Sequence, residues 1–161
     1  MSNLSLYELL PTIKEVLELG KEALFVPSGK SMLPFLLGGK SEVAIKKPTF
    51  PLKKYDISLY KTAEGLLVLH RVVRVSTKGN ETVYTFRGDN TYLNEENITE
   101  KQILAVVTRF KRKTGWQAVD DKSYMFFVRL WTAFYPLRKA LRFLVLLPFR
   151  AIRKIKRIIF G

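Results

Sequence analysis

Residues 65–75 read Gly-Leu-Leu-Val-Leu-His-Arg-Val-Val-Arg-Val, an aliphatic and β-branched run that begins at a glycine. Such a composition is typical of a buried β-strand. Segments of similar composition lie on both sides of this run, and glycine, proline and asparagine separate them. These further predicted strands cover residues 23–26, 42–46, 56–60, 82–87 and 103–110. Because no helical pattern lies between them, the sequence predicts a mainly β fold with a mostly antiparallel sheet or barrel.

The two ends of the chain have a helical pattern instead. Over residues 4–24, leucine, isoleucine and valine recur every three or four positions, which predicts one N-terminal helix. Gly20 marks the end of this helix or a kink in it. Residues 122–160 return to a helical pattern, which Pro136 and Pro148 interrupt.

The charge of the chain is concentrated near its C-terminal end. The formal net charge is +14, and no acidic residue follows Asp121. The basic residues after that position are Lys122, Arg129, Arg138, Lys139, Arg142, Arg150, Arg153, Lys154, Lys156 and Arg157. We therefore expect one domain over residues 1–113, followed by a basic amphipathic helical tail over residues 114–161.

Composition excludes several kinds of site. The chain of 161 residues has no cysteine and one histidine, so it has no disulfide, no thiolate zinc site and no thiol nucleophile. We expect neither a metal nor an organic cofactor. Residues 1–10 lack the basic start of a signal peptide, and no run reaches the roughly 18 apolar residues of a spanning helix. We expect neither element.

A candidate nucleophile lies in Gly29-Lys30-Ser31-Met32-Leu33-Pro34, and the single histidine, His70, is the only imidazole that could activate it. A serine hydroxyl attacks poorly until a neighbouring base takes its proton. Gly29 allows the backbone to come close to a substrate strand. The alternatives are an ordinary turn serine, and a strand histidine that is exposed or hydrogen-bonded in the core.

Four segments in order resemble those of the signal peptidase I and LexA-like serine peptidases. Residues 29–34 resemble the nucleophile box of that superfamily, and residues 54–60 resemble its Gly-Asp-Ile strand. Residues 69–73 resemble the strand that carries the base, and residues 87–90 resemble the Gly-Asp-Asn box. The resemblance covers about residues 22–112. It implies a LexA/signal-peptidase-like antiparallel β domain.

The chain also departs from this pattern. Tyr55 stands where the Gly-Asp-Ile strand has its glycine. The nucleophile box is one residue longer than the bacterial form, so Ser28 is not carried over as an oxyanion donor. The N-terminal transmembrane anchor of the family is missing from the expected elements.

The resemblance implies roles for several residues. Ser31 is the nucleophile, and its backbone amide contributes to the oxyanion hole. His70 is the general base, as in the endoplasmic-reticulum and sporulation-type enzymes, whereas bacterial signal peptidases have lysine there. Asp89 is the expected third residue, which would orient the imidazole, and Glu95 or Glu96 are the acidic alternates. Asp89 has a second interpretation as a turn aspartate that bonds its own backbone.

These residues predict a serine endopeptidase that removes a leader or signal segment from a peptide or protein through an acyl-enzyme. The resemblance implies an extended substrate with small side chains next to the cut. One alternative is a LexA-like regulator that cleaves only itself or nothing, but only one predicted helix precedes Val26, too little for a helix-turn-helix. The other alternative is a membrane-associated peptide-binding protein without activity.

The tail predicts a partner of its own. Its basic residues are interleaved with large apolar ones, as in helices that lie on anionic membranes. We expect residues 123–160 to attach the protein peripherally to such a surface, on the cytoplasmic side. Packing on the β domain or on a protein partner remains open. Nucleic acid is the least favoured partner, because large apolar side chains on one face suit lipid better than phosphate.

Overall fold

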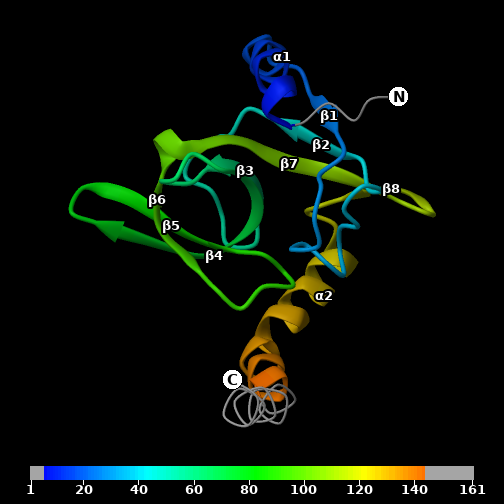
Figure 1. Ribbon diagram of the computed structural model, residues 1–161, viewed down its shortest axis with the longest axis vertical. Coiled ribbons are helices and arrows are strands. Elements are labelled where there is room, and N and C mark those ends of the chain that lie inside the picture. The colour runs from blue at the N-terminus through cyan, green and yellow to red at the C-terminus, as the bar shows by residue number, and fades with distance from the viewer. Residues whose placement is uncertain (1–5, 144–161) are drawn as a thin grey trace, which may run out of the picture. The chain divides into compact units, whose positions relative to one another are not determined.

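The computed structural model describes residues 6–143 of the chain (Figure 1). Its helices and strands are, in chain order, α1 (Leu6–Glu18), β1 (Ala23–Phe25), β2 (Val43–Lys46), β3 (Ile57–Lys61), β4 (Leu67–Lys78), β5 (Glu81–Arg87), β6 (Glu95–Thr99), the 3₁₀ helix η1 (Glu100–Gln102), β7 (Ile103–Arg112), β8 (Gly115–Ala118) and α2 (Lys122–Ala133). The predicted mainly β, antiparallel class is confirmed.

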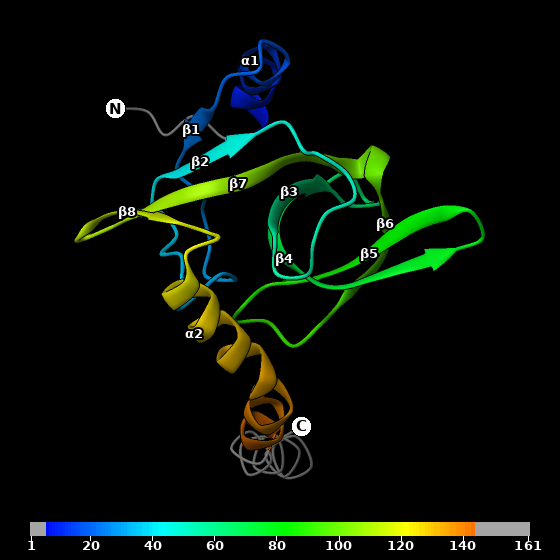
Figure 2. The same cartoon turned by 180° about the vertical axis from the view of Figure 1, so that it is seen from behind.

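Within residues 6–143 the strands form one eight-stranded sheet, in which every pairing is antiparallel. The strand order is β1-β2-β7-β3-β4-β5-β6, and β8 pairs with β7. The sheet is strongly curved, as the front and rear views show (Figures 1 and 2). Strand β7 thus joins the β1–β2 pair to the β3–β6 strands.

Strand β4 is long because it pairs with two different neighbours along its length. Its residues 67–71 pair with β3, and its pairing with β5 begins at Arg71 and continues to Lys78. A tight turn at Gly79 and Asn80 connects β4 to β5. Among the described strands, residues 67–70 therefore have a strand partner on one side only.

Helix α1 is shorter than the predicted segment of residues 4–24. It ends at Glu18, and Gly20 follows with a φ of 72°, in the left-handed region that favours glycine. The backbone N–H of Gly20 donates to the carbonyl of Leu17 at 3.0 Å. Gly20 therefore marks the end of the helix rather than a kink, and Ile13 and Leu17 are its buried residues.

The chain forms two compact units, Met1–Met125 and Phe126–Gly161. The expected boundary near residue 113 therefore moves toward the C-terminus. Residues 115–118, expected in the helical tail, form strand β8 and extend the sheet through its pairing with β7. No helix within residues 6–143 has both the length and the apolar character needed to cross a bilayer.

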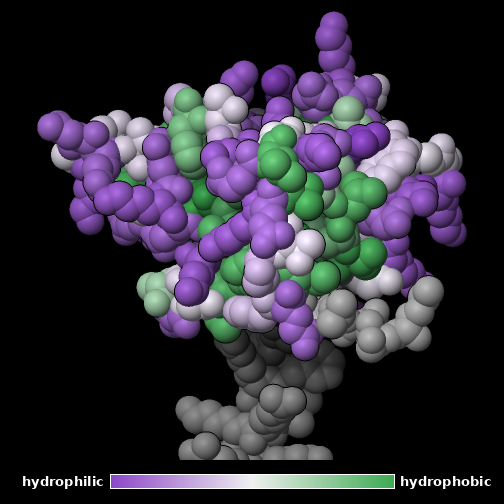
Figure 3. All heavy atoms as spheres, turned by 90° about the horizontal axis from the view of Figure 1, so that it is seen from above, coloured by the Kyte–Doolittle hydropathy of each residue, from purple (hydrophilic) through white to green (hydrophobic). Residues whose placement is uncertain are grey.

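Apolar side chains also reach the surface of the first unit. In the view from above, they gather at the centre of the face, with hydrophilic side chains around them (Figure 3). Exposed large apolar residues of this unit include Leu19, Leu24, Val26, Leu37 and Leu66.

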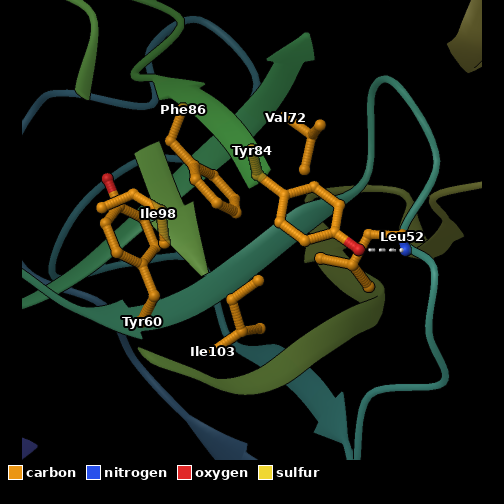
Figure 4. Close-up of a cluster of buried hydrophobic side chains, with 7 residues drawn as sticks. All are labelled: Leu52, Tyr60, Val72, Tyr84, Phe86, Ile98 and Ile103. Carbon is orange, nitrogen blue, oxygen red and sulfur yellow. Dashed lines mark hydrogen bonds between the residues drawn. The ribbon is translucent and has the colours of Figure 1, made fainter. Parts of the chain in front are cut away.

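A buried aromatic cluster fixes the orientation of β3, β4 and β5. It contains Leu52, Tyr60, Val72, Tyr84, Phe86, Ile98 and Ile103 (Figure 4). The rings of Tyr60 and Phe86 stack with their centroids 4.3 Å apart. The hydroxyl of Tyr84 accepts a hydrogen bond from the backbone N–H of Leu52 at 3.1 Å, whereas the hydroxyl of Tyr60 points away from the cluster (Figure 4). Packing thus holds the ring of Tyr60 in place and leaves its hydroxyl oxygen available to the candidate site.

Candidate active site

Ser31 lies in a loop that leaves β1 and returns to β2. Gly29, with a φ of 86°, is in the left-handed region. A Cβ at Gly38 would overlap the backbone of Gly29, so the two arms of the loop touch at their glycines. The backbone N–H of Gly39 also donates to the carbonyl of Pro27 at 2.8 Å. The loop is closed at its base, which holds the half-buried Ser31 in one place.

The turn of Gly88, Asp89 and Asn90 is hydrogen-bonded to this loop. The backbone N–H of Asn90 donates to the carbonyl of Ser31 at 2.7 Å. The side-chain amide of Asn90 donates to the carbonyl of Lys30 at 3.2 Å. Two segments that are far apart in the sequence, both singled out by their motifs, are therefore in direct contact.

Gly88 lies next to both the backbone of Ser31 and the ring of His70. A Cβ placed on Gly88 would lie 2.7 Å from the backbone oxygen of Ser31 and 2.9 Å from Nε2 of His70. Side chains do not tolerate such distances, so this position requires glycine. The structure thus brings the backbone of Ser31 and Nε2 of His70 close to the same residue, Gly88.

The other nitrogen of His70 faces Glu95 and Tyr60. Nδ1 lies 3.1 Å from Oε1 of Glu95 and 3.2 Å from the hydroxyl oxygen of Tyr60. The Tyr60 hydroxyl donates its only proton to Oε2 of Glu95, at 2.8 Å. Both neighbours of Nδ1 therefore act as acceptors, and in the neutral ring the proton belongs on Nδ1. This tautomer leaves the lone pair on Nε2, where a general base needs it.

Burial sets the protonation state of the site. The ring of His70 is buried, and burial lowers its pKa below the ordinary value of 6.5, because a charged imidazole loses its hydration there. The carboxylates of Glu95 and, more weakly, Asp89 act in the opposite direction. Burial and the neighbouring Glu95 raise the pKa of Tyr60 far above its usual range, so it remains a phenol. At neutral pH the imidazole is uncharged and can accept a proton.

Asp89 does not occupy the place beside the imidazole that the sequence analysis expected. Its carboxylate instead forms a bidentate pair with Arg71, at 2.8 Å to Nε and 2.7 Å to Nη2. His70 and Arg71 are consecutive on β4, so their side chains point to opposite faces of the strand. The carboxylate on the Arg71 face is Asp89, and the one in contact with His70 is Glu95. Glu96, the other alternate, is exposed.

Sequence reasoning missed the roles of Arg71 and Tyr60. Arg71 is buried, and it also donates to the carbonyl of Tyr55 and to the hydroxyl of Tyr124, each at 2.9 Å. An arginine within an aliphatic strand requires a buried acidic partner, so the need for a carboxylate could have been read from the sequence. Nothing in the spacing of Tyr60 distinguishes it from other strand aromatics.

A groove runs beside Ser31. Its volume is about 220 Å³, and the residues that line it are Pro27, Ser28, Gly29, Ser31, Met32, Leu36, Gly38, Leu67, Val68 and Leu69. One wall is therefore the Ser31 loop, and the other is the part of β4 that pairs only with β3 among the described strands. The exposed Val26, Leu37 and Leu66 each adjoin a residue of this lining, so the apolar surface continues beyond the groove.

On the side of Leu69 that faces away from β3, no strand within residues 6–143 pairs with its backbone. The backbone of Val72 bonds Asp56 and Tyr55 on the β3 side, at 2.8 Å in both cases. Backbone direction alternates along a strand, so the N–H and C=O of Leu67 and Leu69 point away from β3. The N–H of Leu67 donates to the hydroxyl of Tyr7 at 3.0 Å. The backbone of Leu69, next to His70, is thus available to an added strand.

The chain was compared with known proteins. A scan against models of protein families gives no match, and a search of curated proteins gives none. Within residues 6–143, no group of three or more histidine, aspartate or glutamate side chains is placed to hold a metal ion.

We expect Glu95→Gln to lower kcat by about 10²-fold and to move the acid limb of the pH profile to lower pH. In the wild type, kcat/KM should rise with pH as His70 loses its proton, and burial holds the pKa of this ring below 6.5. Glu95 raises the pKa of His70, so removal of its charge lowers that pKa further. The measurement is kcat/KM for a peptide substrate as a function of pH.

Glu96→Gln is the matched control for this variant. Glu96 follows Glu95 on β6, so its side chain points to the opposite face of the strand, and it is exposed. We expect the same loss of charge at this position to leave both kcat and the acid limb unchanged. An acid limb that moves to higher pH in Glu95→Gln, or an equal shift in Glu96→Gln, would contradict the assignment of Glu95.

Proposed function

We propose that the protein is a serine endopeptidase of the signal peptidase I and LexA-like type, with Ser31 as nucleophile and His70 as general base. The observation that carries the proposal is the orientation of the imidazole. Its Nδ1 is engaged by Glu95 and Tyr60, and its Nε2 lies against Gly88 beside the Ser31 segment. An imidazole held in this way serves a nucleophilic serine, and the network has no evident use in a domain that only binds peptides.

The reaction follows from these positions. Nε2 of His70 takes the proton of the Ser31 hydroxyl as Oγ attacks the peptide carbonyl. The backbone N–H of Ser31 contributes to stabilising the oxyanion. The intermediate collapses to an ester on Ser31, and the imidazolium gives its proton to the leaving amine. Water, activated by the same imidazole, then hydrolyses the ester and releases the acid. Glu95 stabilises the imidazolium that forms in each step.

The groove supports an extended substrate. A peptide strand could pair with the free backbone groups of Leu69, which would set its scissile bond near Ser31. A volume of about 220 Å³ suits one small apolar side chain of the substrate. A leader or signal segment offers such an extended, apolar sequence, and we propose segments of this kind as the substrate class.

One feature of the backbone supports the kinship. Tyr55 stands where the resembling pattern has glycine, and its φ of 83° lies in the left-handed region that glycine adopts without strain. The hydrogen bond from Arg71 to the carbonyl of Tyr55 holds this conformation. Tyr55 therefore has a backbone conformation that suits a glycine at this position, and Arg71 stabilises it.

The proposal is tested with a serine-directed acylating probe, followed by mass spectrometry of the intact and digested protein. We expect one adduct per chain, on Ser31, and we expect Ser31→Ala to lose both the adduct and peptide cleavage. Ser76→Ala, at an exposed position of β4, serves as the control and retains both. If Ser31→Ala processes peptides as the wild type does, the protein is not a serine peptidase of this design.

A further inference from the structure

The described part of the second unit, residues 126–143, carries an exposed apolar stripe. Residues 135–143 continue the helical direction of α2, because the N–H of Phe134 donates to Leu130 and the N–H of Arg138 donates to Phe134, each at 3.0 Å. The stripe consists of large apolar side chains that recur every three or four residues. These are Phe126, Leu130, Phe134, Leu137 and Leu141, each 44–63% exposed. At this spacing they share one face of a helix.

Basic residues flank this apolar stripe. On the helix, Arg129 projects from one side of it, and Arg138 and Arg142 project from the other. The guanidinium of Arg138 lies over the ring of Trp131, 3.8 Å from its centroid, which places both side chains beside the stripe. No acidic residue occurs in the sequence from Lys122 onward, so nothing in this segment offsets the positive charge.

We propose that residues 126–143 bind the surface of a bilayer that contains anionic lipids, with the apolar stripe among the acyl chains and the basic flanks at the phosphates. Charge complementarity selects this occupant. A helix with large apolar side chains on one face, cations on both flanks and no anions matches an anionic interface along its whole length. The residues of this interaction differ from the proposed catalytic residues, and the proposal does not depend on peptidase activity.

Of the expected membrane segment, residues 144–160 lie outside the described residues. The described part already holds the complete stripe and three of its flanking arginines. The test therefore uses the full chain and changes only described positions.

The test is co-sedimentation of the full-length protein with vesicles of phosphatidylcholine, with and without phosphatidylglycerol. We expect binding to the mixed vesicles, at least about tenfold weaker binding to phosphatidylcholine alone, and release by added salt. The double variant Phe126→Asp/Leu137→Asp should weaken binding to mixed vesicles at least about tenfold. Both residues are exposed, so the protein stays folded, and its circular dichroism spectrum verifies this.

Leu93→Asp is the matched control, because Leu93 is 82% exposed in the first unit. It should bind mixed vesicles as the wild type does. A second double variant, Arg129→Glu/Arg142→Glu, should weaken binding to the anionic vesicles and abolish their advantage over phosphatidylcholine. Equal binding by the wild type and the stripe variant would overturn the proposal. The proposal would also be overturned if the protein did not bind vesicles but bound RNA or a second copy of the chain.

Discussion

We expect His70→Gln to lower kcat by about 10⁴-fold or more, with KM nearly unchanged. Glutamine has a similar length, so it can occupy the space between Tyr60 and Gly88, but an amide does not accept a proton at neutral pH. The loss falls on the chemical step because His70 does not line the groove. Single-turnover cleavage of a quenched fluorescent peptide measures it directly.

Chemical rescue provides the control. His70→Ala removes the ring and leaves a space next to Gly88, and added imidazole should restore part of the activity in this variant while leaving Ser31→Ala inactive. Rescue should follow the fraction of uncharged imidazole in solution, because only the neutral base takes the serine proton. If His70→Gln retains more than a tenth of the wild-type kcat, the imidazole is not the base.

The second large effect is on stability. We expect Asp89→Ala to lower the free energy of unfolding by about 3–5 kcal/mol, because it leaves the buried guanidinium of Arg71 without its carboxylate. That loss is a large part of the roughly 5–15 kcal/mol that stabilises an ordinary domain. Urea unfolding, followed by near-ultraviolet circular dichroism, measures it. Asp120→Ala, at an exposed position before α2, is the matched control and changes stability by less than about 0.5 kcal/mol.

This variant also separates the roles of the two acids. Asp89 stabilises the turn that grips the Ser31 loop, so a double-mutant cycle with Arg71→Met should show a coupling energy of about 1–3 kcal/mol. Glu95→Gln, by contrast, should change the pH profile more than the stability. If Asp89→Ala is as stable as the wild type but loses activity to the extent of His70→Gln, Asp89 is the catalytic acid and Glu95 is not.

Most of the sheet could be predicted from the sequence, because six of its strands contain apolar runs bounded by turn residues. The two missed strands have no such pattern. Strand β6 reads Glu-Glu-Asn-Ile-Thr and buries only Ile98, since it lies at the edge of the sheet order. Strand β8 is four residues long and buries none of them. Each of these strands is held by its pairing with the neighbouring strand, β5 or β7, and the composition of the short segment itself gives no sign of this pairing.

The site was predictable only in part, for a geometric reason. The motifs identified Ser31, His70 and the Gly-Asp-Asn turn, but Asp89 and Glu95 follow the same strand within a few residues of each other. The choice between them depends on which face of β4 each one reaches. That choice is fixed by the register of β6 on β5, in which Glu95 lies opposite Phe86. Because this register depends on how the strands pair in the folded sheet, the sequence alone could not decide whether Asp89 or Glu95 contacts His70.

The place of β7 in the sheet has a consequence for the order of synthesis. Ser31 follows β1, His70 lies on β4, and the β1–β2 pair joins β3 and β4 only through β7, the strand of residues 103–112. Because β7 follows both β1 and β4 in the sequence, it is the last of these three strands to leave the ribosome. Until it emerges, no strand pairing joins the β1–β2 pair to the strands that carry His70, and the proposed catalytic residues are linked only by the contact of the Gly88–Asn90 turn with the Ser31 loop. We therefore expect the proposed peptidase activity to arise only late in synthesis, once β7 has joined the two parts of the sheet.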